Sequence, residues 1–264
     1  MNILVCLKQV PDTETQIKIA PDGMSIATEN IKWIINPYDE YAVEEALRIK
    51  EKFGGEVTII GVGPKRVTES IRTALAMGAD KGILVDDPAI TGSDSLGIAR
   101  ILSAVIKDLD YDIILCGKQG VDDDYGIVGS ILAELLGIPQ ISVVIKVEVS
   151  EDASTVKAHR EVEGGTLVIE SALPALITAQ KGLNEPRYAS LPGIMKAKKK
   201  PLDAKTIADL GLDASQVGEN GAKIKIKQIT PPEERKAGKI VEGETPQEMA
   251  ANLTRLLHEE AKVI

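Results

Sequence analysis

The residues best suited to chemistry follow a short apolar run in the middle of the chain. Ile113–Cys116 is too short for a helix and is typical of a strand buried on both faces. The segment Gly117–Tyr125 that follows is polar and glycine-containing. Beyond it, apolar residues recur at helical spacing until Gly137, a residue type that often ends helices. We therefore expect a strand-to-helix turn here, with a helix from near Gly126 to Gly137.

Such a turn has the properties of a phosphate site. At the carboxyl end of a parallel strand, free backbone N–H groups and the positive end of the helix dipole point to one place. Gly126 and Gly129 would let a phosphate approach the backbone, although they could equally serve only a tight turn and close helix packing. Asp122, Asp123 and Asp124 would repel a phosphate unless they face ribose hydroxyls, an amino group or water. We expect at least one of these carboxylates to be only solvated.

Composition excludes several classes of function. The 264 residues are 44% hydrophobic, which is enough for a globular core. The net charge is -9, and the basic residues form no stripe interleaved with aromatics, so nucleic-acid binding is not expected. No apolar segment is long enough to span or insert into a bilayer, and the N-terminus is too short and weakly charged for a signal peptide. We expect a cytoplasmic protein, or an organelle-lumen protein if a presequence has been removed.

Cysteine and histidine give no sign of a metal site. Cys6 and Cys116 each lie in a predicted strand, which favours buried apolar packing over a disulfide or a metal pair. His159 and His258 are the only histidines, and neither lies in a catalytic or ligand motif.

The elements around the turn alternate between strand and helix. This rhythm predicts right-handed crossovers and a mostly parallel, doubly wound sheet with helices on both faces. Its ligands would lie beyond the carboxyl ends of the strands. Neither G-x-G-x-x-G after the first strand nor G-x-x-x-x-G-K-[ST] is present, which argues against hydride transfer of the dinucleotide type and P-loop phosphoryl transfer. The expected strands are 2–9, 56–61, 83–85 and 113–116, and the expected helices are 36–50, 67–77 and 93–109. In the first of these helices we expect Asn36 as the N-cap and Pro37 at the first helical position.

After Pro139 the pattern changes to strands without helices. Segments 141–149, 155–161, 166–170 and 175–179 predict an antiparallel extension of the sheet. We divide the chain into an α/β domain, 1–182, and a second part, 183–264. This second part holds a short helix capped by Ser190 and, beyond Pro201, a C-terminal arm.

The arm contains an alternating segment, Ile224–Gln228, that predicts a strand, and a helix that starts at the capping box Thr245–Glu248. One face of this helix is apolar, and the arm has no core of its own, so another surface must cover it. That surface is either this chain's own sheet or a partner subunit. The apolar face consists of Met249, Leu253, Leu256 and Leu257.

Six motifs together resemble the beta subunit of electron transfer flavoprotein over nearly the whole chain. Each motif would be weak alone, and the last is the most distinctive. They are Lys8–Asp12, Asn36–Tyr38, Arg72–Asp80, Gly117–Gln119, Arg160–Gly165 and Leu183–Lys200.

The resemblance implies an electron-carrier subunit that pairs with an alpha subunit. It implies acyl-CoA dehydrogenase-type donors, a quinone oxidoreductase-type acceptor, and a redox FAD held mainly by the alpha subunit. Thr13 and Glu161 match residues near that flavin. Leu191 matches a leucine that enters a pocket of the dehydrogenase, beside Lys196, Lys198 and Lys199.

The resemblance also implies a nucleotide buried in this subunit: a structural AMP in most relatives, a second FAD in electron-bifurcating ones. The matching positions are Cys6, Asn36, Tyr38, Asp39, Val62, Gly117, Gln119, Val121, Asp122, Asp124, Gly126, Ile127, Val128 and Gly129.

The loop departs from both types of relative. Bifurcating relatives tend to carry D-G-D-T-x-Q-V-G-P where this chain has Asp122–Ser130. AMP-binding relatives usually keep N-Q-T-G where it has Gly126-Ile127-Val128-Gly129. With amide and hydroxyl side chains missing, phosphate binding must rest on backbone N–H groups and Ser130. The run Asp122–Asp124 and the segment Leu183–Lys200 resemble the AMP type, so we favour AMP and keep the bifurcating, FAD-binding type as the alternative.

Two other functions fit the same architecture. An enzyme of the adenine-nucleotide alpha-hydrolase type would bind ATP at the strand ends, but no residue pair here offers an activated nucleophile or a base held by a third group. A stress-type adenine-nucleotide binding module would not need the arm. The sequence therefore favours an electron-transfer subunit rather than an enzyme.

Overall fold

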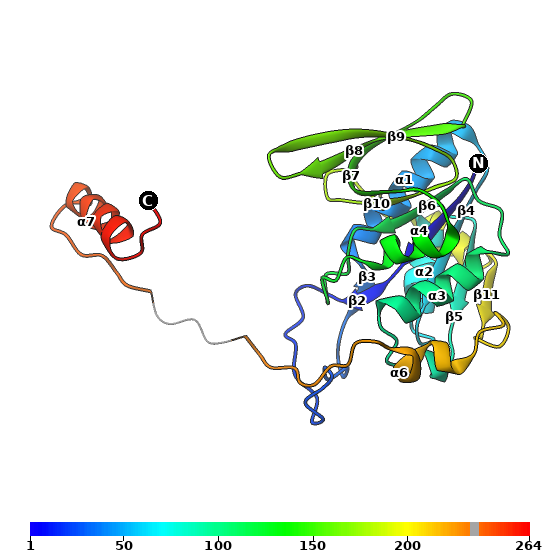
Figure 1. Cartoon of the computed structure of the whole chain (residues 1–264), viewed down its shortest axis with the longest axis horizontal. Coiled ribbons are helices and arrows are strands. Elements are labelled where there is room, and N and C mark those ends of the chain that lie inside the picture. Colours follow the sequence, from blue (N-terminus) through cyan, green and yellow to red (C-terminus); the bar gives the residue numbers. More distant parts are fainter. Residues whose placement is uncertain (233–237) are drawn as a thin grey trace.

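The structure is a computed structural model that describes residues 1–232 and 238–264. A nine-stranded sheet with the order β11-β5-β4-β1-β6-β10-β7-β8-β9 forms its centre (Figure 1). The order reverses beside β1, since the chain runs from β1 outward to β4 and β5 and then returns to β6 on the other side. The strands are β1 (Asn2–Leu7), β4 (Glu56–Val62), β5 (Lys81–Val85), β6 (Ile113–Gly117), β7 (Gln140–Val149), β8 (Thr155–Val162), β9 (Gly165–Ala172), β10 (Ala175–Ala179) and β11 (Leu202–Lys205).

Helices cover both faces of the sheet. Side chains of α1 (Pro37–Phe53) and α2 (Val67–Met77) pack into the core on one face, and those of α3 (Ser95–Ile106) and α4 (Val128–Leu136) into the core on the other. Shorter elements follow the chain around these layers. They are β2 (Gln9–Pro11), β3 (Trp33–Ile35), η1 (Pro88–Ile90), α5 (Leu191–Ala197), η2 (Ala214–Gln216) and α6 (Gly218–Gly221).

Strand β1 shows how the sheet is buried on both faces. Ile3 and Val5 belong to the core under α1 and α2, while Leu4 and Cys6 belong to the core under α3 and α4. Burying each large side chain stabilises the fold by about 1.5 to 3 kcal/mol. From β11 to β7 every neighbouring pair is parallel, so the predicted doubly wound architecture is confirmed.

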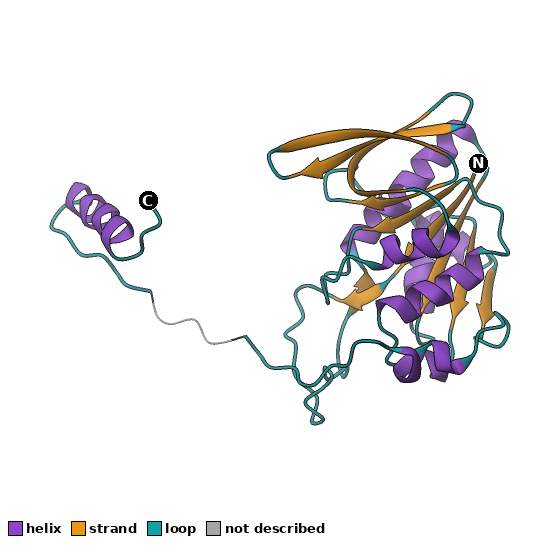
Figure 2. Ribbon diagram, in the orientation of Figure 1, coloured by secondary structure: helices purple, strands orange, loops and turns teal. Residues whose placement is uncertain are grey.

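The extension past Pro139 differs in one strand from the prediction. β8 is antiparallel to both of its neighbours, β7 and β9, as expected, and the three strands form the long ribbons at the top of Figure 2. β10, however, is parallel to both β6 and β7 and lies between them. Every residue of β10 is buried, which suits an interior strand, but local pattern does not reveal which strands flank it.

Three smaller predictions also need correction. The predicted strand 2–9 stops at Leu7, and Gln9–Pro11 pairs instead with β3 in a separate two-stranded sheet. Ile224–Gln228 forms no strand, because alternation needs a neighbouring strand to pair with. β11 was not predicted, although it pairs with β5 at the sheet edge. The division of the chain at 182/183 stays a prediction. Strand β11, from the predicted second part, pairs with β5 in the sheet of the predicted first part.

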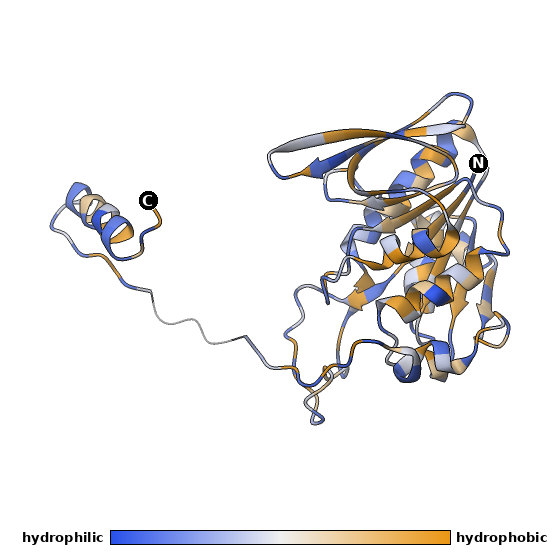
Figure 3. Ribbon diagram, viewed as in Figure 1, coloured by the Kyte–Doolittle hydropathy of each residue, from blue (hydrophilic) through white to orange (hydrophobic). Residues whose placement is uncertain are grey.

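Helix α7 (Pro246–Glu259) lies apart from the sheet (Figure 1). Thr245 Oγ1 caps it by accepting a hydrogen bond from the Glu248 N–H, as the capping box predicts. None of its residues is buried, and its apolar residues share the surface with polar ones (Figure 3). Among the described helices, none is both long and apolar enough to cross a membrane.

Since α7 buries nothing against the sheet, deletion of residues 245–264 should change the free energy of unfolding by less than about 0.5 kcal/mol. As the control, Leu115→Ala in the fully buried strand β6 should lower it by about 2 to 5 kcal/mol. Urea titration of both variants measures the difference. A large loss on deletion would show that α7 packs on its own sheet.

Candidate functional site

A cavity of about 290 Å³ lies where the strand order reverses. The carboxyl ends of β1, β4 and β6 form its floor, the place at which doubly wound sheets bind ligands. The starts of α3 and α4 close it from the side. Its lining comprises Cys6, Leu7, Lys8, Asn36, Asp39, Val62, Ser93, Asp94, Ser95, Ile98, Leu102, Cys116, Gly117, Lys118, Gln119, Gly120, Asp123, Tyr125, Gly126, Ile127, Val128 and Gly129.

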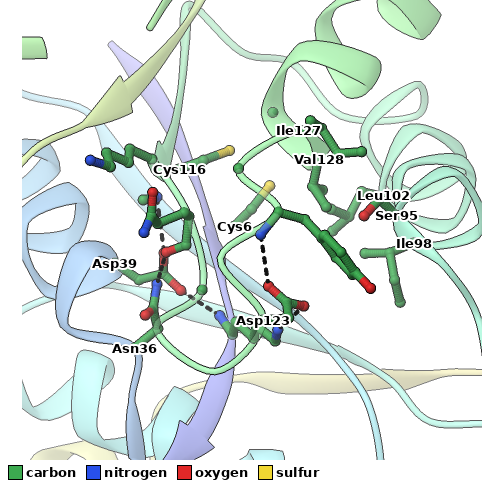
Figure 4. Close-up of a pocket in the computed structure, with 18 of the residues that line it drawn as sticks. Cys6, Asn36, Asp39, Ser95, Ile98, Leu102, Cys116, Asp123, Ile127 and Val128 are labelled. Atoms are coloured by element: carbon green, nitrogen blue, oxygen red, sulfur yellow. Dashed lines mark hydrogen bonds and ion pairs between the residues drawn. The ribbon is translucent and has the colours of Figure 1, made fainter. Parts of the chain in front are cut away.

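Asp39 organises the polar side of this cavity (Figure 4). One carboxylate oxygen accepts the Lys8 N–H at 2.6 Å, just past β1, and the other accepts the Gly117 N–H at 2.9 Å, at the end of β6. The first turn of α1 therefore joins the ends of two neighbouring strands. Gly117 must be glycine, because a Cβ there would collide with Asp39.

Asn36 holds the loop that follows β6. Its Nδ2 donates to the Gln119 carbonyl at 2.8 Å, and its Oδ1 accepts the Val121 N–H at 3.1 Å. Asn36 occupies the N-cap position of α1, with Pro37 in the first turn as predicted, but its side chain makes no capping hydrogen bond. The predicted cap is thus wrong: the amide holds the loop instead of the helix.

The carboxyl group of Asp39 is 4% exposed. Burial raises its pKa from 3.8 to about 7, because a charge is poorly solvated there, although the Lys8 and Gly117 N–H groups favour the ionised form and act in the opposite direction. Asp39 therefore changes its charge close to neutral pH.

The three consecutive aspartates all have side-chain partners. Lys8 Nζ binds Asp122 at 2.7 Å and Asp123 at 2.8 Å, and Gln119 Nε2 donates to Asp124 at 2.5 Å. Burial alone would lower the pKa of Lys8, but the two aspartates outweigh it and raise that pKa. The expectation that one carboxylate is only solvated is therefore wrong. Lys8 pairs with two of them, and its single positive charge offsets one of their two negative charges, which reduces their repulsion of an anion.

The opposite side of the cavity is apolar. Ile98 and Leu102 of α3 face Ile127 and Val128 at the start of α4 (Figure 4). Ile127 occupies the N-cap position of α4, and no side chain caps this helix, so its first N–H groups remain available to a ligand. An apolar wall next to free N–H groups suits a ligand with a flat ring and an anionic group.

The two glycines of the turn serve different needs. Gly126 has a φ of 62°, in the left-handed region that favours glycine. Gly129 lies against β10, where an added Cβ would be 2.9 Å from the Thr178 methyl group. Close packing therefore explains Gly129, while both residues also line the cavity.

The structure brings together most of the residues predicted to bind the nucleotide. Tyr38, Val121, Asp122 and Asp124 do not line the cavity. Tyr38 instead lies under Lys118 Nζ, which is 5.4 Å from the ring centroid. The lining residues among those predicted are Cys6, Asn36, Asp39, Val62, Gly117, Gln119, Gly126, Ile127, Val128 and Gly129.

Residues at the start of α3 were missed. Ser93, Asp94 and Ser95 line the cavity, and the Asp94 side chain caps α3 by accepting the Gly97 N–H. Polar residues between a strand and a helix indicate a helix cap. Because this turn follows the carboxyl end of a strand, its residues could have been included among the predicted ligand-binding residues. Lys8 belongs to a strand end where a ligand is expected, but it is not among the residues predicted to bind the nucleotide.

Cys6 and Cys116 are free, buried and directly opposite in the pairing of β1 with β6, as their predicted apolar role requires. Their hydrogen bond, together with burial, raises the pKa of the Cys116 thiol. In the described part of the chain, no three His, Cys, Asp or Glu residues gather as a metal site would need.

The other predicted residues lie away from this cavity. Thr13 is exposed, and Glu161 accepts a hydrogen bond from Gln180 Nε2 at 2.7 Å. Leu191 is 79% exposed at the start of α5. Lys196, Lys198 and Lys199 are exposed at the other end of that helix.

The fold and the cavity define the class: an α/β protein whose doubly wound sheet carries a ligand-sized cavity at the point where the strand order reverses. Residues 23–210 match the family described as the electron transfer flavoprotein domain. The chain is 45% identical to the electron transfer flavoprotein subunit beta of Bacillus subtilis over 100% of both chains. It is 40% identical to that of Mus musculus over 96% of both chains. The chain therefore belongs to the electron transfer flavoprotein beta-subunit family.

The buried Asp39 should make the stability of this protein depend on pH. Between about pH 4 and 7 the folded chain keeps a proton that the unfolded chain has released, so the free energy of unfolding falls as pH rises, by up to about 1.4 kcal/mol per unit. Asp39→Asn removes the titrating group and should lack this dependence. Urea titrations of both proteins across that range measure it. Parallel curves would show that Asp39 stays ionised throughout.

Proposed function

We propose that this chain is the beta subunit of a heterodimeric electron carrier. It passes electrons from acyl-CoA dehydrogenase-type donors, as in fatty acid oxidation, to a quinone oxidoreductase-type acceptor, through an FAD shared with an alpha subunit. Relatives that match it over their full length carry the name electron transfer flavoprotein subunit beta, which supports the role. A cytoplasmic location of the bacterial type belongs to the same proposal.

We also propose that the cavity holds a structural AMP. The observation that supports this proposal is that the apolar side of the cavity lies next to the uncapped N-terminus of α4. Ile98, Leu102 and Val128 offer a surface for the adenine ring, and the N–H groups of the first turn of α4 offer donors for one phosphate. The bound nucleotide would stabilise the subunit by contacting both the start of α4 and the carboxyl ends of β1 and β6.

The size of the cavity favours AMP over a second FAD. Ligand cavities span about 300 to 1,000 Å³, and 290 Å³ lies just below that range. A mononucleotide needs less room than a dinucleotide. The alternative is an electron-bifurcating carrier with a second FAD in this subunit, and acid extraction followed by chromatography of the released nucleotides separates the two.

An enzyme acting on an adenine nucleotide is less well supported. Along the described cavity lining there is no histidine to act as a base. The Cys116 thiol is a poor nucleophile, because its raised pKa keeps it protonated. Both carboxylate oxygens of Asp39 accept backbone N–H groups, so this side chain has a structural role rather than that of a catalytic base.

Gly129 allows a test of the phosphate position. Gly129→Asp places a carboxylate at the start of α4 and should abolish retention of AMP. Gly129→Ala is the matched control, because it adds the same Cβ against Thr178 without a charge. The measurement is the nucleotide content of the denatured protein. If the alanine variant loses AMP as completely as the aspartate one, packing rather than charge explains the loss; normal content in the aspartate variant rejects the site.

The C-terminal arm is proposed to pack on the alpha subunit. Met249 and Leu253 are 44% and 46% exposed, so the apolar face of α7 is open to a partner. Deletion of residues 245–264 should weaken pairing with the alpha subunit, since each buried side chain contributes about 1.5 to 3 kcal/mol before ordering costs. Analytical ultracentrifugation of mixed subunits measures the affinity. Equal affinity for the full and truncated chains would contradict this role of the arm.

A further inference from the structure

The motif Arg72–Asp80 makes no contact with the cavity. It covers the second half of α2 and the turn after it, where α2 packs against α5.

Arg72 closes the end of α5. Its Nη1 donates to the Ala197 carbonyl at 2.6 Å and to the Lys200 carbonyl at 2.7 Å. The last carbonyls of a helix have no helical partner, and they carry the negative end of the helix dipole. Ala197 is the last residue of α5 and Lys200 lies in the turn just past it, so the guanidinium group binds the helix end together with the turn that follows.

Lys200 closes the end of α2 in return. Its Nζ donates to the Leu75 carbonyl at 2.9 Å and to the Ala79 carbonyl at 2.5 Å. Lys196, Lys198 and Lys199 of the same lysine-rich run are exposed, so Lys200 alone of the four is directed inward. Arg72 of α2 thus binds carbonyls at the end of α5, and Lys200, just past the end of α5, binds carbonyls at the end of α2.

The backbones of the two helices also approach closely. A Cβ on Gly193 of α5 would collide with the Ala76 carbonyl oxygen of α2. Glycine at position 193 is therefore what allows α5 to lie flat on the motif.

A second anchor lies upstream of α5. Arg187 Nε binds Glu44 at 2.7 Å, and its Nη1 binds Glu51 at 2.5 Å. Asn184 Nδ2 donates to the Tyr41 carbonyl and to Glu45, both at 3.0 Å. Helix α1 therefore holds the chain before α5, and α2 holds it after.

Large apolar side chains stand exposed between these anchors. Tyr188 is 98% exposed, Leu191 79% and Met195 72%. A segment held at both ends presents them without the ordering cost that a flexible loop would pay on binding. Exposed apolar residues on an ordered segment are typical of a docking surface.

We propose that Arg72 and Lys200 form a reciprocal helix-end clamp that keeps α5 ordered, and that Arg72 is thereby a positioning residue for docking of the electron donor. The donor part rests on the proposed function. The clamp part concerns this chain alone, so the two parts can fail separately.

Hydrogen exchange tests the clamp in the complex of this chain with its alpha subunit. Arg72→Met keeps the apolar stem and removes the donors, so amide exchange in residues 190–200 should rise at least about tenfold. Arg72→Lys, which keeps a charged donor, should restore much of the protection. The control is Arg100→Met, because Arg100 of α3 likewise donates to a distant carbonyl, that of Gln216. Unchanged exchange in Arg72→Met would overturn the clamp.

Stopped-flow reduction of the same complexes by an acyl-CoA dehydrogenase, itself reduced with its acyl-CoA substrate, tests positioning. At sub-saturating complex, Arg72→Met should slow electron transfer about tenfold with AMP and FAD contents unchanged. Leu191→Ala should slow it comparably while leaving hydrogen exchange unchanged. If exchange rises in Arg72→Met but transfer keeps its rate, while Leu191→Ala slows it, the positioning role is wrong. If Leu191→Ala has no effect, the proposed docking contact itself fails.

Discussion

One buried carboxylate connects most of what the cavity requires. Asp39, in the first turn of α1, accepts N–H groups from the ends of both β1 and β6, the strands between which the sheet changes direction. Strand ends at such a point diverge and leave backbone groups unpaired, and an unpaired buried N–H is costly. A single side chain with two acceptor oxygens satisfies both, and because it comes from the helix on one face, it also sets where that helix begins.

The rest of the cavity is arranged around this connection. Asn36, three residues before Asp39, gives up the capping role of its position and holds the loop after β6. That loop carries Asp122, Asp123 and Asp124. The backbone N–H of Lys8 donates to Asp39, and its side chain pairs with the first two of these aspartates. The outcome is a cavity with a polar side and an apolar side. At the Gly126-Ile127-Val128 turn the groups left free are backbone N–H groups, since no side chain caps α4.

The cavity and the segment around α5 both use α1, whose first turn holds the strand ends through Asp39 and whose Glu44 and Glu45 hold the chain before α5. The cavity depends on strand ends and the starts of helices, where N–H groups are free. The segment around α5 depends on the ends of helices, where carbonyls are free and cations satisfy them.

The sequence by itself determined the parts that depend on local pattern. Buried apolar runs, helical spacing and capping residues predicted the doubly wound sheet, the bounds of α2 and the start of α7, and six motifs together predicted the family. Tertiary structure alone decided what depends on long-range pairing. It placed β10 between β6 and β7, added β11 at the edge, and brought the start of α3 into the cavity. It also turned Lys200 inward while its neighbours stayed in solvent. The physical reason is that periodicity specifies which face of an element is buried, whereas the neighbour that buries it is chosen by packing across the whole chain.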